Sequence, residues 1–138
     1  MHVPPAERAA RWLAYARADR AAAERLAVDL WHVACFHAQQ ASEKALKALL
    51  TRIQGDAVPT PLAHVLLRAL SELGEAVPDD VASAANALDR YYIPTRYPDA
   101  LDFADAALVY STQDARQAIG WADTVLRWCE VRIAAQQV

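Results

Sequence analysis

Apolar positions recur every three or four residues along most of this chain, which is the spacing of amphipathic helices. The first helix is expected over Pro5–Leu26, because paired prolines suit a helix start. Asp29 is expected to cap or precede the second helix, which continues to about Gln54 and stops at Gly55. These two segments cover more than a third of the sequence, so helix dominates from the beginning.

Two shorter helices are expected next, over residues 62–73 and 79–90, with Gly74 and Pro78 between them. Residues 91–98, YYIPTRYP, then contain two prolines four apart and cannot be regular helix throughout. Nothing in this region alternates as a strand would. We therefore expect an irregular stretch here.

The irregular stretch is expected to reach Tyr110, and a last helix to begin at Ser111 or Thr112. Ser111 and Asp114 form an S-x-x-D pattern that resembles a capping box. The sequence thus predicts an all-α fold, an up-and-down bundle of four to five helices, two of them long. Its length suits a single helical domain over residues 1–138.

Composition strengthens the helical prediction and narrows the class of protein. Alanine is the commonest residue and only three glycines occur, which favours helix. No apolar run approaches the roughly 18 residues that a membrane span needs, and Glu7 and Arg8 interrupt any signal-peptide core.

Cys35 and Cys129 lie in separate apolar segments, without CxxC spacing, and are expected to be buried reduced thiols. We expect a cytoplasmic protein without metal or cofactor.

The charge pattern contains one candidate site, on the second helix. A net charge of −3 argues against a strongly basic nucleic-acid binder, but leaves room for a local cationic groove. Both lysines, Lys44 and Lys47, share a helical face with His37 and Gln40, within about 80° of arc. The opposite side carries Leu46, Leu49, Leu50 and Ile53.

This polar stripe has two interpretations. Two ammonium groups one turn apart could neutralise a phosphate, while an imidazole or amide reads a base or ribose. In the plain alternative, the stripe is a solvated helix face. A separate possibility is that Glu43 pairs with Lys47 at i, i+4 and uses up that charge.

The second candidate is Arg96, in the proline-stiffened segment around Tyr97. An arginine among tyrosines can offer a fork to phosphate and rings on which bases stack. In the structural alternative, Tyr91, Tyr92 and Tyr97 pack the loop down while Arg96 bonds Asp99 or a helix C-terminus.

Four pieces of the chain resemble one known family. Residues 36–50, FHAQQASEKALKALL, resemble the hallmark segment of HEPN domains, named for higher eukaryotes and prokaryotes nucleotide-binding. Three further pieces follow in the expected order: LAHVLLRALSEL, YIPTRYPDA and ARQAIGWADTVLRWCEVRI. The resemblance implies an α-helical bundle that acts as a homodimer. Members include RNase toxins, non-catalytic nucleotide-binding modules, and small proteins that pair with a minimal nucleotidyltransferase in toxin–antitoxin systems.

The chain departs from the RNase members of that family. Those carry an Arg, four to six residues and a His near the start of the last helix, but no His follows Arg96 at that spacing. Arg25 and His32 have a permitted spacing, yet they flank the first inter-helix turn, and one such match is close to chance. We therefore predict a non-catalytic module that binds nucleotide or RNA and acts with a separate nucleotidyltransferase chain.

Two alternatives remain open at this point. One is a metal-independent RNase toxin with a divergent site, in which Tyr97, Asp99 or His37 substitutes for the missing His beside Arg96. The other is an inert helical dimer that only scaffolds a partner. The sequence predicts binding residues His37, Gln40, Lys44, Lys47, Arg96 and Tyr97.

Overall fold

The computed structural model describes residues 2–92, 95, 97–102 and 104–136, and these residues form helices with no strand among them. The predicted all-α bundle is therefore confirmed. Three helices have 22 to 24 residues, whereas the sequence predicted two long ones. In chain order the elements are α1 (Pro5–Leu26), α2 (Trp31–Gln54), α3 (Ala63–Glu72), α4 (Asp79–Asp89), the 3-10 turn η1 (Pro98–Leu101), α5 (Ala106–Val109) and α6 (Thr112–Ala135).

Local signals in the sequence set the ends of the long helices. Helix α2 ends at Gly55, whose φ of 88° lies in the left-handed region that glycine adopts without steric cost. Helix α6 begins with the predicted capping box: Ser111 Oγ accepts from the Asp114 N–H, and Asp114 accepts from the Ser111 N–H. Asp29 does not cap α2, because Leu30 holds the N-cap position without a side-chain bond.

The segment between α4 and α6 is more regular than predicted. It contains η1 and α5, each of four residues, within the stretch expected to be irregular. Elements this short show no periodicity in the sequence, so pattern analysis misses them.

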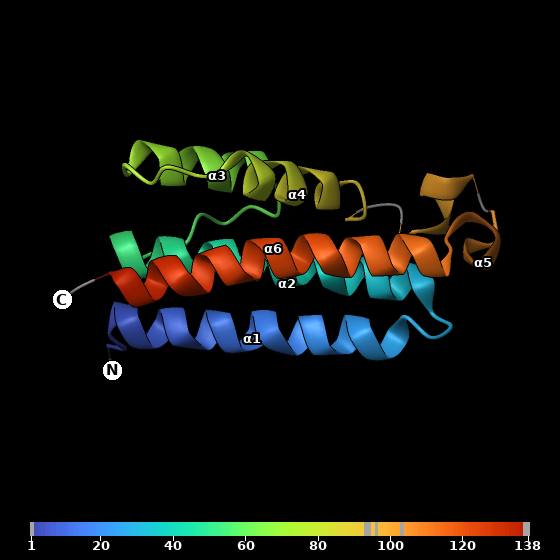
Figure 1. The fold of residues 1–138 in the computed structure, drawn as a ribbon, viewed down its shortest axis with the longest axis horizontal. Helices are drawn as coiled ribbons and strands as arrows, with labels where there is room; N and C mark the ends of the chain where they lie inside the picture. The colour runs from blue at the N-terminus through green and yellow to red at the C-terminus, as the bar shows by residue number, and fades with distance from the viewer. Residues whose placement is uncertain (1, 93–94, 96, 103, 137–138) are drawn as a thin grey trace.

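Helix α2, which lies behind α6 in Figure 1, contacts α1, α3, α4, α5 and α6 and is the helix on which the others pack. Helices α1, α2 and α6 lie side by side along the bundle, and α2 makes its most extensive contacts with α1 and α6. Helices α3 and α4 form a second layer, in which α4 packs mainly on α6. The start of α1 and the end of α6 lie at the same end of the bundle. The central position of α2 means that almost every side chain on it meets another helix.

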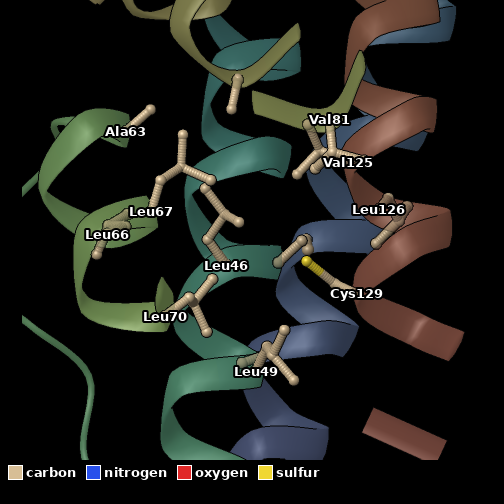
Figure 2. Close-up of a cluster of buried hydrophobic side chains, with 14 of the residues drawn as sticks. Leu46, Leu49, Ala63, Leu66, Leu67, Leu70, Val81, Val125, Leu126 and Cys129 are labelled. Atoms are coloured by element: carbon tan, nitrogen blue, oxygen red, sulfur yellow. The ribbon is translucent and has the colours of Figure 1, made fainter. Parts of the chain in front are cut away.

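Two hydrophobic clusters fill the interior. The first joins α2 to α3, α4 and the C-terminal half of α6, as Figure 2 shows for Leu46, Leu70 and Cys129. The second, nearer the α1–α2 turn, surrounds Cys35 and includes Tyr91. Both cysteines are free and buried, as predicted, and burial raises the pKa of the Cys35 thiol to about 12.

Ion pairs bridge α1 and α6 at the surface. The two helices are antiparallel, so residue numbers rise along one as they fall along the other. The Arg20 guanidinium forms two parallel bonds to the Asp123 carboxylate, at 2.9 and 3.1 Å. The other pairs on this seam are Arg17–Glu130 and Arg116–Glu24. They align α1 with α6, where direct packing is much less extensive than between α1 and α2.

Replacement of Leu46 by Ala tests the first cluster. Leu46 is fully buried, so the cavity should lower the free energy of unfolding by about 2–5 kcal/mol, measured by urea denaturation. Val131→Ala is the matched control, because this valine is 66% exposed and should change stability by less than about 0.5 kcal/mol. Equal losses in the two variants would contradict the packing described here.

Candidate functional site

The polar stripe of α2 lies against α1 and not in open solvent. Asp19 of α1, only 9% exposed, places its carboxylate between two predicted site residues. His37 Nδ1 lies 2.8 Å from one carboxylate oxygen, and Lys44 Nζ donates to the other at 2.5 Å. Because a carboxylate only accepts, this contact implies that the His37 proton is on Nδ1. One acidic group from α1 thus holds two predicted site residues of α2.

A second acidic group, Glu43, organises the rest of the stripe. Lys47 Nζ donates to Glu43 at 2.9 Å, the i, i+4 pair that the sequence offered as an alternative. The amides of Gln39 and Gln40 each lie 3.4 Å from the same carboxylate, and Gln40 also donates to Gln39 at 2.8 Å. The network satisfies polar groups that would otherwise be costly to bury.

The interpretation of the stripe as a solvated face is therefore wrong. The side chains of His37, Lys44 and Lys47 are 29%, 22% and 11% exposed. Contact with α1 explains the burial, which a pattern read on α2 alone does not reveal. Phosphate binding by these residues stays a prediction.

Both lysines lie against aromatic rings of α1. Lys47 Nζ is 5.5 Å from the centroid of the Trp12 ring, and Lys44 Nζ is 5.9 Å from that of Tyr15. These distances are within the range of cation–π attraction. Tyr15 is 66% exposed. The buried lysines thus support aromatic side chains, one of them on the surface.

Two adjoining hollows lie at this aromatic pair. The first, which we name the α1 hollow, measures about 310 Å³ and is lined by Arg8, Arg11, Trp12 and Tyr15. The second, the loop hollow, measures about 370 Å³. It shares Arg8 and Trp12 with the first and adds Lys47, Thr51 and residues 56–59. The hollows form the candidate site.

Two arginines supply positive charge to these hollows. Arg8 Nε donates to the Val3 carbonyl at 3.1 Å and Nη2 to the Gly55 carbonyl at 2.5 Å, and no ion pair of Arg8 occurs within the described residues. Arg11 pairs with Glu7 at 2.9 Å, and both side chains are more than half exposed. Such a pair contributes about 0–1 kcal/mol, so an incoming anion can displace it.

Sequence reasoning missed the α1 residues of the site. Arg8, Arg11, Trp12 and Tyr15 follow the spacing i, i+3, i+4, i+7, which confines them to one face of α1. Two arginines and two aromatic rings on one helical face are a pattern from which this site could have been predicted. The buried alanines on the other side of α1, at 9, 16 and 23, indicate only the core-facing stripe.

The predicted loop site is described only in part. Arg96 lies outside the described residues. Tyr97 is 45% exposed and makes interactions of its own, whereas Tyr91 is buried, with its ring 6.1 Å from that of Tyr110. The structural alternative, that tyrosines pack the loop down, is thus confirmed for Tyr91. His32 also lies near Tyr110, at 6.3 Å between ring centroids.

Metal and membrane features are absent from the part of the chain that the structure describes. None of its His, Cys, Asp and Glu side chains gather in threes with metal-binding geometry. No described helix combines the length and the apolar character needed to cross a bilayer.

Comparison with known proteins links this chain to a family. The family model for the HEPN domain matches residues 9–132. TT1696 from Thermus thermophilus is 39% identical, with a TM-score of 0.79 over 91% of this chain and 98% of that one. ST0689, described as an archaeal HEPN homologue, is 30% identical, with a TM-score of 0.71 over 91% and 97% of the two chains. No curated protein matches the chain.

Asp19→Asn tests the role of the buried carboxylate. The neutral amide keeps the shape of the side chain but lacks the charge shared by His37 and Lys44, so we expect a loss of about 1.5–3 kcal/mol in unfolding free energy. Urea denaturation at neutral pH measures it. Asp29→Asn, at an exposed position of the α1–α2 turn, is the matched control and should be nearly neutral. A neutral Asp19 variant would show that the network contributes nothing.

Proposed function

The chain belongs to the HEPN domain family, and we propose that it is a non-catalytic module that binds nucleotide or RNA and acts with a separate minimal nucleotidyltransferase, as one half of a toxin–antitoxin pair. One observation carries the binding proposal. Trp12 and Tyr15 stand on the same face as Arg8 and Arg11 and each rests against a lysine ammonium. Rings beside cations suit a ligand that combines flat bases with phosphates.

Each component of this face has a role in the proposed binding. The Tyr15 ring, which is exposed, would stack on a base, and the Arg11 guanidinium would contact phosphate. Lys44 and Lys47 would hold the rings in position from below, because Asp19 and Glu43 neutralise most of their charge. His37 and Gln40 would act indirectly, because their bonds to Asp19 and Gln39 hold the network in place. Arg96 and Tyr97 remain a proposed second contact region.

Exposed apolar side chains support the proposed homodimer and partner binding. Val28 and Leu30, in the α1–α2 turn, are 75% and 46% exposed, and Leu108 and Val109 on α5 are 86% and 45% exposed. Helix α5 lies at the same end of the bundle as that turn and contacts α2 (Figure 1). Apolar residues grouped at one end are typical of an interaction surface.

A second candidate function is favoured by the Asp19–His37 pair. A carboxylate that holds the Nδ1 proton of an imidazole leaves Nε2 as an acceptor, an arrangement that suits a general base. This is the chemistry needed by the alternative function, a metal-independent RNase with a divergent site. The binding module remains the preferred function, because His37 is largely buried between α1 and α2.

Binding to a fluorescein-labelled single-stranded RNA, measured by anisotropy, tests the preferred function. Tyr15→Ala removes the exposed ring and should cost about 1–3 kcal/mol, at least about a fivefold rise in Kd. Arg11→Ala should also weaken binding and reduce its salt dependence. Arg127→Ala, an exposed arginine on α6, is the matched control. Binding that is equal in all four proteins would refute the α1 face as the site.

RNA degradation by purified protein in EDTA tests catalysis separately. We expect no cleavage by the wild type. Activity that disappears in His37→Ala or Arg96→Ala, with the fold intact by circular dichroism, would establish the RNase alternative. Loss confined to an Arg25→Ala/His32→Ala double variant would assign catalysis to the residues flanking the α1–α2 turn.

A further inference from the structure

The loop hollow has a different chemical character from the open face of α1. It lies between the N-terminal half of α1, the C-terminal half of α2 and residues 56–59. Its volume of about 370 Å³ is at the lower end of the range for small-molecule sites, about 300–1,000 Å³. The hollow can therefore take a small ligand and not a folded macromolecule.

A hydroxyl without a partner points to a missing ligand group. Thr51 lines the loop hollow and is 1% exposed, yet its Oγ1 has no hydrogen-bond partner among the described residues. A helical threonine usually bonds the carbonyl three or four residues back, and a buried polar atom without a bond costs about 1–3 kcal/mol. A rotation of χ1 by about 120° places the hydroxyl where the methyl now lies. A ligand in the hollow could thus give Thr51 the bond that it lacks.

The charges around Thr51 specify an anion. Arg8 is oriented by the Val3 and Gly55 carbonyls, which use two of its five N–H donors and leave its charge without a carboxylate partner in the described structure. Lys47 is paired with Glu43, but an ammonium has two more donors. A phosphate group fits these donors because it offers several strong acceptor oxygens.

The remaining lining of the hollow specifies what the phosphate is attached to. The Trp12 indole is shared with the α1 hollow and offers a flat apolar surface. Asp56 contributes a carboxylate at the rim, which repels phosphate but accepts hydrogen bonds from sugar hydroxyls. Ala57, Val58 and Pro59 form an apolar wall. An anion, hydroxyls and a flat ring together describe a nucleoside phosphate.

We propose that the loop hollow binds a nucleoside monophosphate, with its phosphate at Arg8, Lys47 and Thr51, its ribose toward Asp56 and its base on Trp12. This inference rests on the proposed function and assigns a ligand class to one part of the site. The same pocket would accept a free mononucleotide or the phosphorylated end of an RNA strand, since the two share this chemistry.

Titration with AMP, adenosine and inorganic phosphate, followed by tryptophan fluorescence and calorimetry, tests the proposal. AMP should bind at least about tenfold more tightly than either fragment, because only AMP reaches both the cations and the ring. Thr51→Val should weaken AMP binding about tenfold without lowering stability, since it removes a hydroxyl that has no partner. Thr124→Val, whose hydroxyl bonds the Gly120 carbonyl on α6, is the matched control.

The outcomes separate this inference from the proposed function. No AMP binding, or AMP binding unchanged in Thr51→Val, would overturn the inference, even if labelled RNA still binds in a Tyr15-dependent way. Failure of both AMP and RNA to bind would overturn the proposed function as well. Tighter binding of a 5′-phosphorylated RNA than of AMP, again lost in Thr51→Val, would support the pocket and identify the strand end as its source.

Discussion

The burial of α2 on nearly all sides is the constraint on which the rest of the structure depends. A helix surrounded by α1, α3, α4 and α6 cannot direct its polar residues into bulk water. Each charge on it therefore needs a partner, because an unpaired buried ion is far too costly to keep. Asp19 from α1 and Glu43 from α2 itself provide these partners. The pairing also fixes the register of α1 on α2, since Asp19 must meet both His37 and Lys44.

The sequence predicted the helices well where local chemistry decides their ends. Helix ends are set within one turn of the chain by Gly55, the Ser111 capping box and the prolines. These ends can therefore be predicted without knowledge of the tertiary structure. The short elements η1 and α5 depend on packing at the end of the bundle and leave no periodic trace. Two long helices were predicted, whereas α1, α2 and α6 each have 22 to 24 residues.

The candidate site was predicted only in part, for a related physical reason. The arc shared by His37, Lys44 and Lys47 follows from helix geometry and is present in the structure. The residues that face this arc are set by the packing of α1 on α2. Asp19 is 18 residues from His37 and 25 from Lys44 along the chain, so local sequence does not reveal the contact. The rings of Trp12 and Tyr15 join the site through the same docking. The residue pattern of α2 alone therefore predicts neither the Asp19 contacts nor the nearby rings.

These contacts give the lysines and the arginines of the site different roles in ligand binding. Ion pairs with Asp19 and Glu43 neutralise most of the positive charge of Lys44 and Lys47. These lysines therefore attract a distant anion only weakly. They do hold the Tyr15 and Trp12 rings in place before any ligand arrives. A surface ordered in advance loses less conformational entropy on binding. Arg8 and Arg11 have no buried ion pair and are left to attract an anion from solution, so long-range attraction and preorganisation come from different residues of one face.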